Sequence, residues 1–168
     1  MRNAVNFVAF QIGWFAAVLG AGTGRPWLGV VVVPLVLLLA MRMSADSRGE
    51  LRLALSAAAL GFVVDTLLIV SGVFLPIAYA TPYPLSPLWM VMLWVNQATT
   101  LNFCMSWLRG RYAIGALFGA IGGPLAYLAG AKLGAAAIPS SGELIVLAIV
   151  WMVAFPALLA LNRYTGRR

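Results

Sequence analysis

Residues 25–43 read RPWLGVVVVPLVLLLAMRM, and this run decides the class of the fold. No charged residue lies between Arg25 and Arg42, and the stretches Val30–Val33 and Leu35–Leu39 are wholly apolar. A helix that crosses the hydrocarbon core of a bilayer needs about 20 apolar residues. The run therefore predicts a transmembrane helix.

The rest of the chain has the same character. Of its 168 residues, 63% are hydrophobic and 9% are charged, and the mean hydropathy is +0.99. A soluble domain carries about 25% charged residues, because it must face water. The length suits one transmembrane domain over residues 1–168, with no separate soluble domain.

Six apolar runs have the length of a membrane span. They cover residues 4–22, 26–43, 51–75, 87–108, 112–134 and 143–162. We therefore predict an all-α fold, a polytopic membrane helix bundle of six transmembrane helices.

The basic residues set the expected orientation. Most of them fall in segments that one side of a six-span bundle would share, namely Arg2, Arg42, Arg48, Arg52, Arg109, Arg111, Arg163, Arg167 and Arg168. The opposite side would hold Arg25 and Lys132. Because cytoplasmic segments are enriched in Lys and Arg, this pattern predicts cytoplasmic N- and C-termini in a bacterial inner (cytoplasmic) membrane. The net charge of +7 is thereby assigned to topology rather than to nucleic acid.

The first run has a second interpretation, a signal peptide cleaved near Ala21. It is the weaker one, because only Arg2 supplies a basic N-terminal region and the apolar stretch contains Asn6 and Gln11. The other spans would keep their orientation in either case.

Residue content excludes several kinds of chemistry. The chain has no histidine and a single cysteine, Cys104. A Ser-His-Asp triad, a Cys-His pair and a His/Cys metal site are therefore excluded. We expect no metal and no cofactor. Membrane lipid is the expected partner, and a homo-oligomer or another membrane partner stays open.

Most acidic residues have a local explanation. The sequences SRGE at 47–50 and SSGE at 140–143 are typical of capping boxes, in which Ser and Glu satisfy the first amides of a helix. Asp46 lies in a predicted loop. This leaves Asp65 as the acid deep inside a span, where an unpaired charge costs at least about 2.5–3.5 kcal/mol.

Counting along the helices places candidate partners beside Asp65. It lies about 21 Å from the inner surface at about 1.5 Å per residue, and Tyr127 lies at nearly the same level. Asn96 and Gln97 come close to the midplane, and the flexible stem of Lys132 allows it to bend inward or to reach outward. A second polar layer is formed by Gln11 and Asn102, nearer the inner face.

Two interpretations of these residues stay open. They line a polar cavity that opens outward, with Asp65 as a proton-binding or cation-binding group, or they form hydrogen bonds that hold the helices together. For Gln11 and Asn102 the second interpretation is favoured.

The fourth and fifth spans have distinct expected roles. The fourth span is the most polar, so we predict a central helix with polar residues on two faces. Gly115, Gly119 and Gly123 in the fifth span allow close helix packing. Pro124 cannot donate a backbone hydrogen bond, so it predicts a kink there.

Several segments resemble an uncharacterised family of bacterial inner-membrane proteins, domain of unknown function 2878. The resemblance rests on NF at 6–7, FQIGWF at 10–15, Asp65, PLWM at 87–90 with LW at 93–94, and GPLAY at 123–127 through Gly130 to LGA at 133–135. It implies no established activity. The family pattern often has Cys near position 17, where this chain has Ala17, so no role of that thiol is carried over.

Three functions follow from these observations. The first is binding or transport of a small molecule or lipid in a pocket around Asp65. The second is an enzyme or accessory factor of membrane-lipid modification, with Asp65 as acid or base, Tyr127 as a hydrogen-bond donor and Lys132 at a headgroup. The third is a structural or assembly subunit. Whether the protein is an enzyme stays open.

Overall fold

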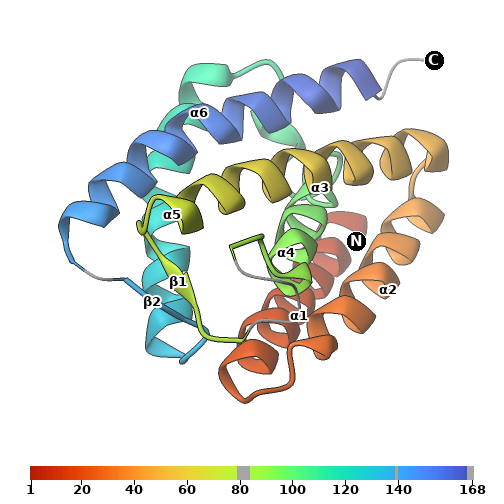
Figure 1. Ribbon diagram of the computed structural model, residues 1–168. Helices are drawn as coiled ribbons and strands as arrows, with labels where there is room; N and C mark the ends of the chain where they lie inside the picture. The colour runs from red at the N-terminus through yellow and green to blue at the C-terminus, as the bar shows by residue number, and fades with distance from the viewer. Residues whose placement is uncertain (79–83, 139, 166–168) are drawn as a thin grey trace.

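The fold is all-α, as the composition predicts. The computed structural model describes residues 1–78, 84–138 and 140–165. Within them the chain forms six α-helices, namely α1 (Arg2–Gly22), α2 (Trp27–Met43), α3 (Ser47–Val70), α4 (Leu88–Ala98), α5 (Tyr112–Lys132) and α6 (Gly142–Thr165) (Figure 1). A short 3₁₀-helix, η1 (Ser106–Leu108), and two very short strands, β1 (Leu75–Pro76) and β2 (Ala136–Ala137), complete the described elements.

Four helices, α1, α3, α5 and α6, are long and apolar enough to cross a membrane. The helix α2 is apolar but shorter, with 17 residues. Large apolar side chains point outward from these helices, among them Leu67 at 63% exposure and Val153 at 65%. Such surfaces are unfavourable in water and suit lipid. The protein is therefore a multi-pass membrane protein.

The helices form two tight pairs around a central element. The helix α1 packs along α2, and α5 packs along α6. Figure 1 shows α4 at the centre, and it contacts α1, α2 and α3. The helix α4, which is the helical part of the predicted fourth span, therefore lies centrally, as expected.

The third helix ends earlier than predicted. It ends at Val70, whereas the apolar run continues to residue 75. Gly72 reverses the chain with a φ of 72°, a conformation that other residues rarely adopt. Leu75 and Pro76 then pair antiparallel with Ala137 and Ala136. This small β1–β2 pair joins two connections that are far apart in the sequence.

The fourth span is not one helix, which corrects the prediction for residues 87–108. The helix α4 ends at Ala98, and turns follow up to η1. The hydroxyl of Thr99 donates to the carbonyl of Asn96, and that of Thr100 to the carbonyl of Gln97, both at 2.7 Å. Such local bonds compete with a helix. The two polar faces of a continuous helix therefore do not exist.

Side chains from other helices bind the backbone that the break leaves free. Asn6 of α1 donates its amide to the carbonyl of Thr99 at 3.0 Å, and Asn162 of α6 donates to that of Leu101 at 3.5 Å. Irregular backbone at membrane depth is tolerated where protein groups satisfy it in this way.

The predicted capping box at residues 47–50 is wrong. The N-cap of α3 is Asp46, whose carboxylate accepts from the amide of Gly49 at 2.8 Å. Ser47 instead donates to the carbonyl of Met41. Glu50 is left without a capping role and is buried. At the start of α6, Ser140 accepts from the amide of Gly142 and pairs with Glu143.

Candidate functional site

Asp65 lies where three helices meet. It belongs to α3, and its side chain has no exposed surface. One carboxylate oxygen accepts from the indole nitrogen of Trp94 on α4 at 2.9 Å, and the other accepts from the hydroxyl of Tyr127 on α5 at 3.0 Å. The indole N–H can only donate, so its partner must be an acceptor, as a carboxylate oxygen is.

Glycines make room for the indoles around this acid. Gly61 lies one turn before Asp65, and a Cβ at Gly61 would collide with the ring of Trp94. Trp94 stacks on Trp151 of α6, with ring centroids 4.7 Å apart and planes 15° from parallel. Gly123 of α5 leaves the same kind of space for Trp151. The glycine pattern thus serves the stacked indoles as well as helix packing.

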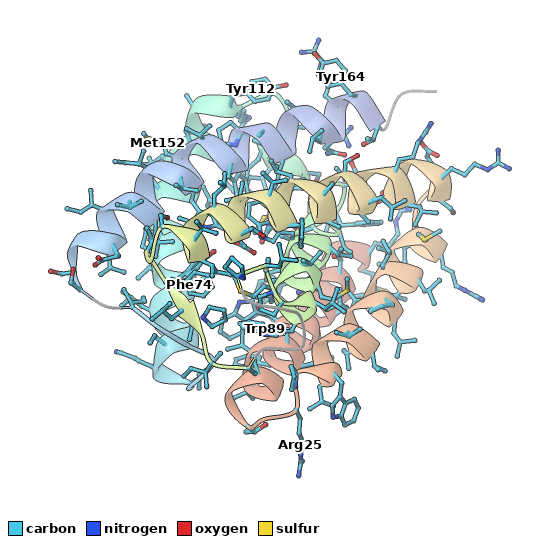
Figure 2. All side chains as sticks on the ribbon, in the orientation of Figure 1. Arg25, Phe74, Trp89, Tyr112, Met152 and Tyr164 are labelled. Carbon is cyan, nitrogen blue, oxygen red and sulfur yellow. The ribbon has the colours of Figure 1, made fainter. Side chains whose placement is uncertain are left out.

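A cavity of about 360 Å³ lies beside Asp65. Its described lining includes four of the six tryptophans of the chain and five of the eight phenylalanines, together with Tyr127. In Figure 2, Phe74 and Trp89, which both line it, lie toward the interior, whereas Arg25 and Tyr164 point away. The cavity therefore gathers about half of the aromatic side chains in one place.

The cavity reaches the outer surface of the bundle between α1 and α5. Phe15 of α1 and Phe118 of α5 both line it, and both are exposed. Ala126, further along α5, lines it as well and is exposed.

The described lining of the cavity contains an acidic side chain but no basic one. Among the described residues that line it, Asp65 is the one acid, and none is Lys or Arg. Besides Asp65, Tyr127 and the indole N–H groups of the four tryptophans, the polar side chains of this lining are the amides Gln11 and Gln97. The described wall is therefore mainly apolar, and Asp65 is its single buried acid.

The structure brings together some of the predicted site residues and separates others. Asp65, Tyr127, Gln97 and Gln11 all line the cavity. Asn96 is buried beside it but turns toward α1, where its amide donates to the carbonyl of Phe10 at 2.9 Å.

The other predicted residues lie elsewhere. Lys132 is exposed at the end of α5 and does not line the cavity, so it is not a partner of Asp65. Asn102 lies at a different polar site. Pro124 is inside α5, and the kink expected there stays a prediction.

Of that second polar site, the sequence predicted Asn102 but paired it with Gln11, and it missed Glu50 and Arg109. Asn102 donates to the carboxylate of Glu50 at 2.9 Å and accepts from Arg109 at 2.8 Å. A cavity of about 610 Å³ surrounds this chain of bonds, and Arg2 and Arg163 also line it. The bonds link α3 to the segment after α4, and residues of α1 and α6 complete the lining of this cavity.

One sequence signal could have indicated that Glu50 belongs to this second polar site. Asp46 is as good an N-cap residue as Ser47, and Asp46 lies three residues before Gly49. With Asp46 as the cap, Glu50 has no local role, and a buried carboxylate at 3% exposure then requires a partner.

The fold and cavity define a class, a multi-pass α-helical membrane protein with an aromatic-lined cavity that holds one buried acid. The sequence profile of the family described as protein of unknown function (DUF2878) matches residues 3–157, and the chain belongs to this family. The resemblance noted from the sequence is thereby confirmed. No curated protein and no solved structure matches the chain.

Proposed function

We propose that this protein binds an apolar small molecule or a lipid chain within the membrane, in the cavity beside Asp65. The observation that carries the proposal is the cavity itself, which is about 360 Å³ in volume and has ten aromatic side chains in its described lining. Ligand sites are typically concave and apolar, about 300–1,000 Å³ in volume, with a few polar groups that orient the ligand. Tyr127 and the amides of Gln11 and Gln97 are the groups of this kind in the described lining.

The place of the opening supports a ligand that arrives from the bilayer. Phe15 and Phe118 border the cavity on surfaces that face outward from α1 and α5. A molecule in the hydrocarbon could enter between them without crossing water. Membrane lipid is therefore the partner that we propose.

The geometry supports binding better than catalysis. Both carboxylate oxygens of Asp65 already accept hydrogen bonds, and no surface of this side chain is exposed. An acid or base must reach the proton that it transfers. As the acid or base of a lipid-modifying enzyme, Asp65 would need Tyr127 or Trp94 to move first. A purely structural role would not account for the cavity.

For the topology we propose six crossings with cytoplasmic termini, in a bacterial inner membrane. At about 1.5 Å per residue the 17 residues of α2 extend about 26 Å, close to the thickness of a bilayer core. The fourth crossing would consist of α4 and the irregular segment that ends with η1. The charge pattern of the connections supports this orientation.

Photolabelling tests the proposed binding. The full chain is reconstituted in phosphatidylcholine vesicles with a neutral alkyl diazirine, and the labelled residues are mapped by mass spectrometry. We expect label on Trp14 and Tyr127 in the cavity as well as on lipid-facing Leu38. Gly122→Leu would fill the cavity and reduce labelling of the first two only, because a side chain at Gly122 meets little besides Phe118.

The matched control is Ala113→Leu, an exposed position on the same helix that does not line the cavity. It should leave all labelling unchanged. Label confined to lipid-facing residues in the unmodified protein would contradict the proposed function.

A further inference from the structure

We infer that the ligand of this cavity is an apolar organic cation, such as a quaternary ammonium or an aryl phosphonium compound. The inference rests on the proposed function and names the class of ligand. The first observation concerns the ionisable side chains of the lining. Among the described residues of the lining Asp65 is the one acid, and none is Lys or Arg.

The hydrogen bonds of Asp65 favour its anionic form. Trp94 and Tyr127 each donate to one of its oxygens, at 2.9 and 3.0 Å. Donors of this kind stabilise a carboxylate but leave its net charge in place. Burial has the opposite effect and favours the neutral acid, because a charge in an apolar site is costly unless it is paired. A ligand that brings a positive charge supplies the missing pair.

The aromatic wall is suited to the same ligand. The faces of Trp, Tyr and Phe rings are electron-rich and attract a cation within about 6 Å of the ring centre. Trp94 and Trp151 stack on each other, and Phe74 meets Tyr127 edge-on with centroids 5.1 Å apart. Tyr127 donates a hydrogen bond from its hydroxyl to Asp65, and this bond makes the ring of Tyr127 more electron-rich.

Asp65 need not touch the ligand. Its side chain has no exposed surface, so the ligand contacts the rings of Trp94 and Tyr127 that cover it. The negative charge acts across these rings over a short distance and in an apolar medium, where screening by water is weak. Asp65 is accordingly a residue that sets the charge preference of the site.

The wall also excludes other cations. Hard metal ions take about six or more oxygen ligands, and they part with bound water reluctantly. Besides the covered Asp65 and Tyr127, the described lining offers only the amides of Gln11 and Gln97 as side-chain oxygen ligands. An organic cation with an apolar body requires few such ligands, and it can reach the opening through the bilayer.

Two ions of nearly equal size and opposite charge test the inference. Tetraphenylphosphonium and tetraphenylborate are each equilibrated by dialysis with the detergent-purified full chain, and uptake by protein-free micelles is subtracted. We expect saturable binding of the phosphonium with an affinity at least about tenfold above that of the borate. Asp65→Asn should bring the phosphonium affinity down to the level of the borate.

Two further variants complete the test. Glu143→Gln neutralises a partly exposed carboxylate at the start of α6, outside the cavity, and should leave both affinities unchanged. If Asp65→Asn fails to fold, Trp14→Leu removes one aromatic face from the α1 wall and should weaken the phosphonium alone.

The outcomes separate the inference from the proposed function. Equal affinities for the two ions, with cavity labelling by the neutral diazirine intact, would overturn the cationic ligand and leave the binding function standing. Absence of saturable binding of either ion, with label only on lipid-facing residues, would overturn both.

Discussion

Asp65 illustrates what one buried carboxylate requires of its neighbours. Two helices each supply one donor to it, and a glycine on its own helix makes room for the larger of the two. Leaving a buried charged group without a donor costs about 1.5–3 kcal/mol or more. The arrangement of Trp94 and Tyr127 is therefore a condition for the stability of this helix junction.

Removal of one donor tests this requirement. Tyr127→Phe keeps the ring and deletes the hydroxyl that donates to Asp65, so we expect the free energy of unfolding to fall by about 1.5–3 kcal/mol. Tyr164→Phe is the control, because Tyr164 is 79% exposed. Unfolding in detergent, followed by tryptophan fluorescence, measures both. Equal stability of the two variants would show that the hydrogen bond is unimportant.

Part of this site was accessible from the sequence. Depth along a helix follows from residue counting, and Asp65 and Tyr127, predicted at one level, are hydrogen-bonded. Counting does not give the rotation of a helix about its axis, so Asn96 was expected in the pocket although it faces α1. The sequence did not indicate that Trp94 donates to Asp65. The binding role of these residues stays a prediction.

At the scale of elements, the break after α4 is the main departure from the sequence prediction. Hydropathy along residues 87–108 favours one long helix, because it registers only how apolar the segment is. The break depends on Asn6 and Asn162, which lie far away in the sequence and bind the backbone of Thr99 and Leu101. Single-sequence periodicity carries no record of such contacts.

The stability of the break can be measured at Asn6. Asn6→Ala removes the donor to the buried carbonyl of Thr99, and we expect a loss of about 1–3 kcal/mol in the free energy of unfolding. Asn3→Ala, at an exposed position of the same helix, should have little effect. If thermal unfolding in detergent finds the two variants alike, the hydrogen bond from Asn6 does not hold this segment.

At the scale of the whole molecule, the membrane class follows from composition alone, since no soluble fold could bury so many apolar side chains. The number of helices follows from the count of apolar runs. The cavity does not, because it depends on how α1 and α5 are placed beside α4. That placement is set by packing between helices rather than by any single one.

The proposed orientation gives a direct expectation. In a Cys104→Ala background, Arg25→Cys should react with a membrane-impermeant maleimide added to intact spheroplasts, because it lies on the outer side. Arg48→Cys should react only after lysis. Both positions are exposed in the structure. Labelling of Arg48→Cys in intact cells would contradict cytoplasmic termini.

The pairing of Asp65 also bears on how the chain is synthesised. Asp65 leaves the ribosome 29 residues before Trp94 and 62 residues before Tyr127. If α3 enters the bilayer as soon as it is synthesised, its acid lacks both donors at that time, at a cost of about 2.5–3.5 kcal/mol for the ionised form. Its apolar residues offset that cost until α4 and then α5 arrive. The order of synthesis is thus the order in which the buried carboxylate is stabilised, and the cavity is completed only after α6 has been added.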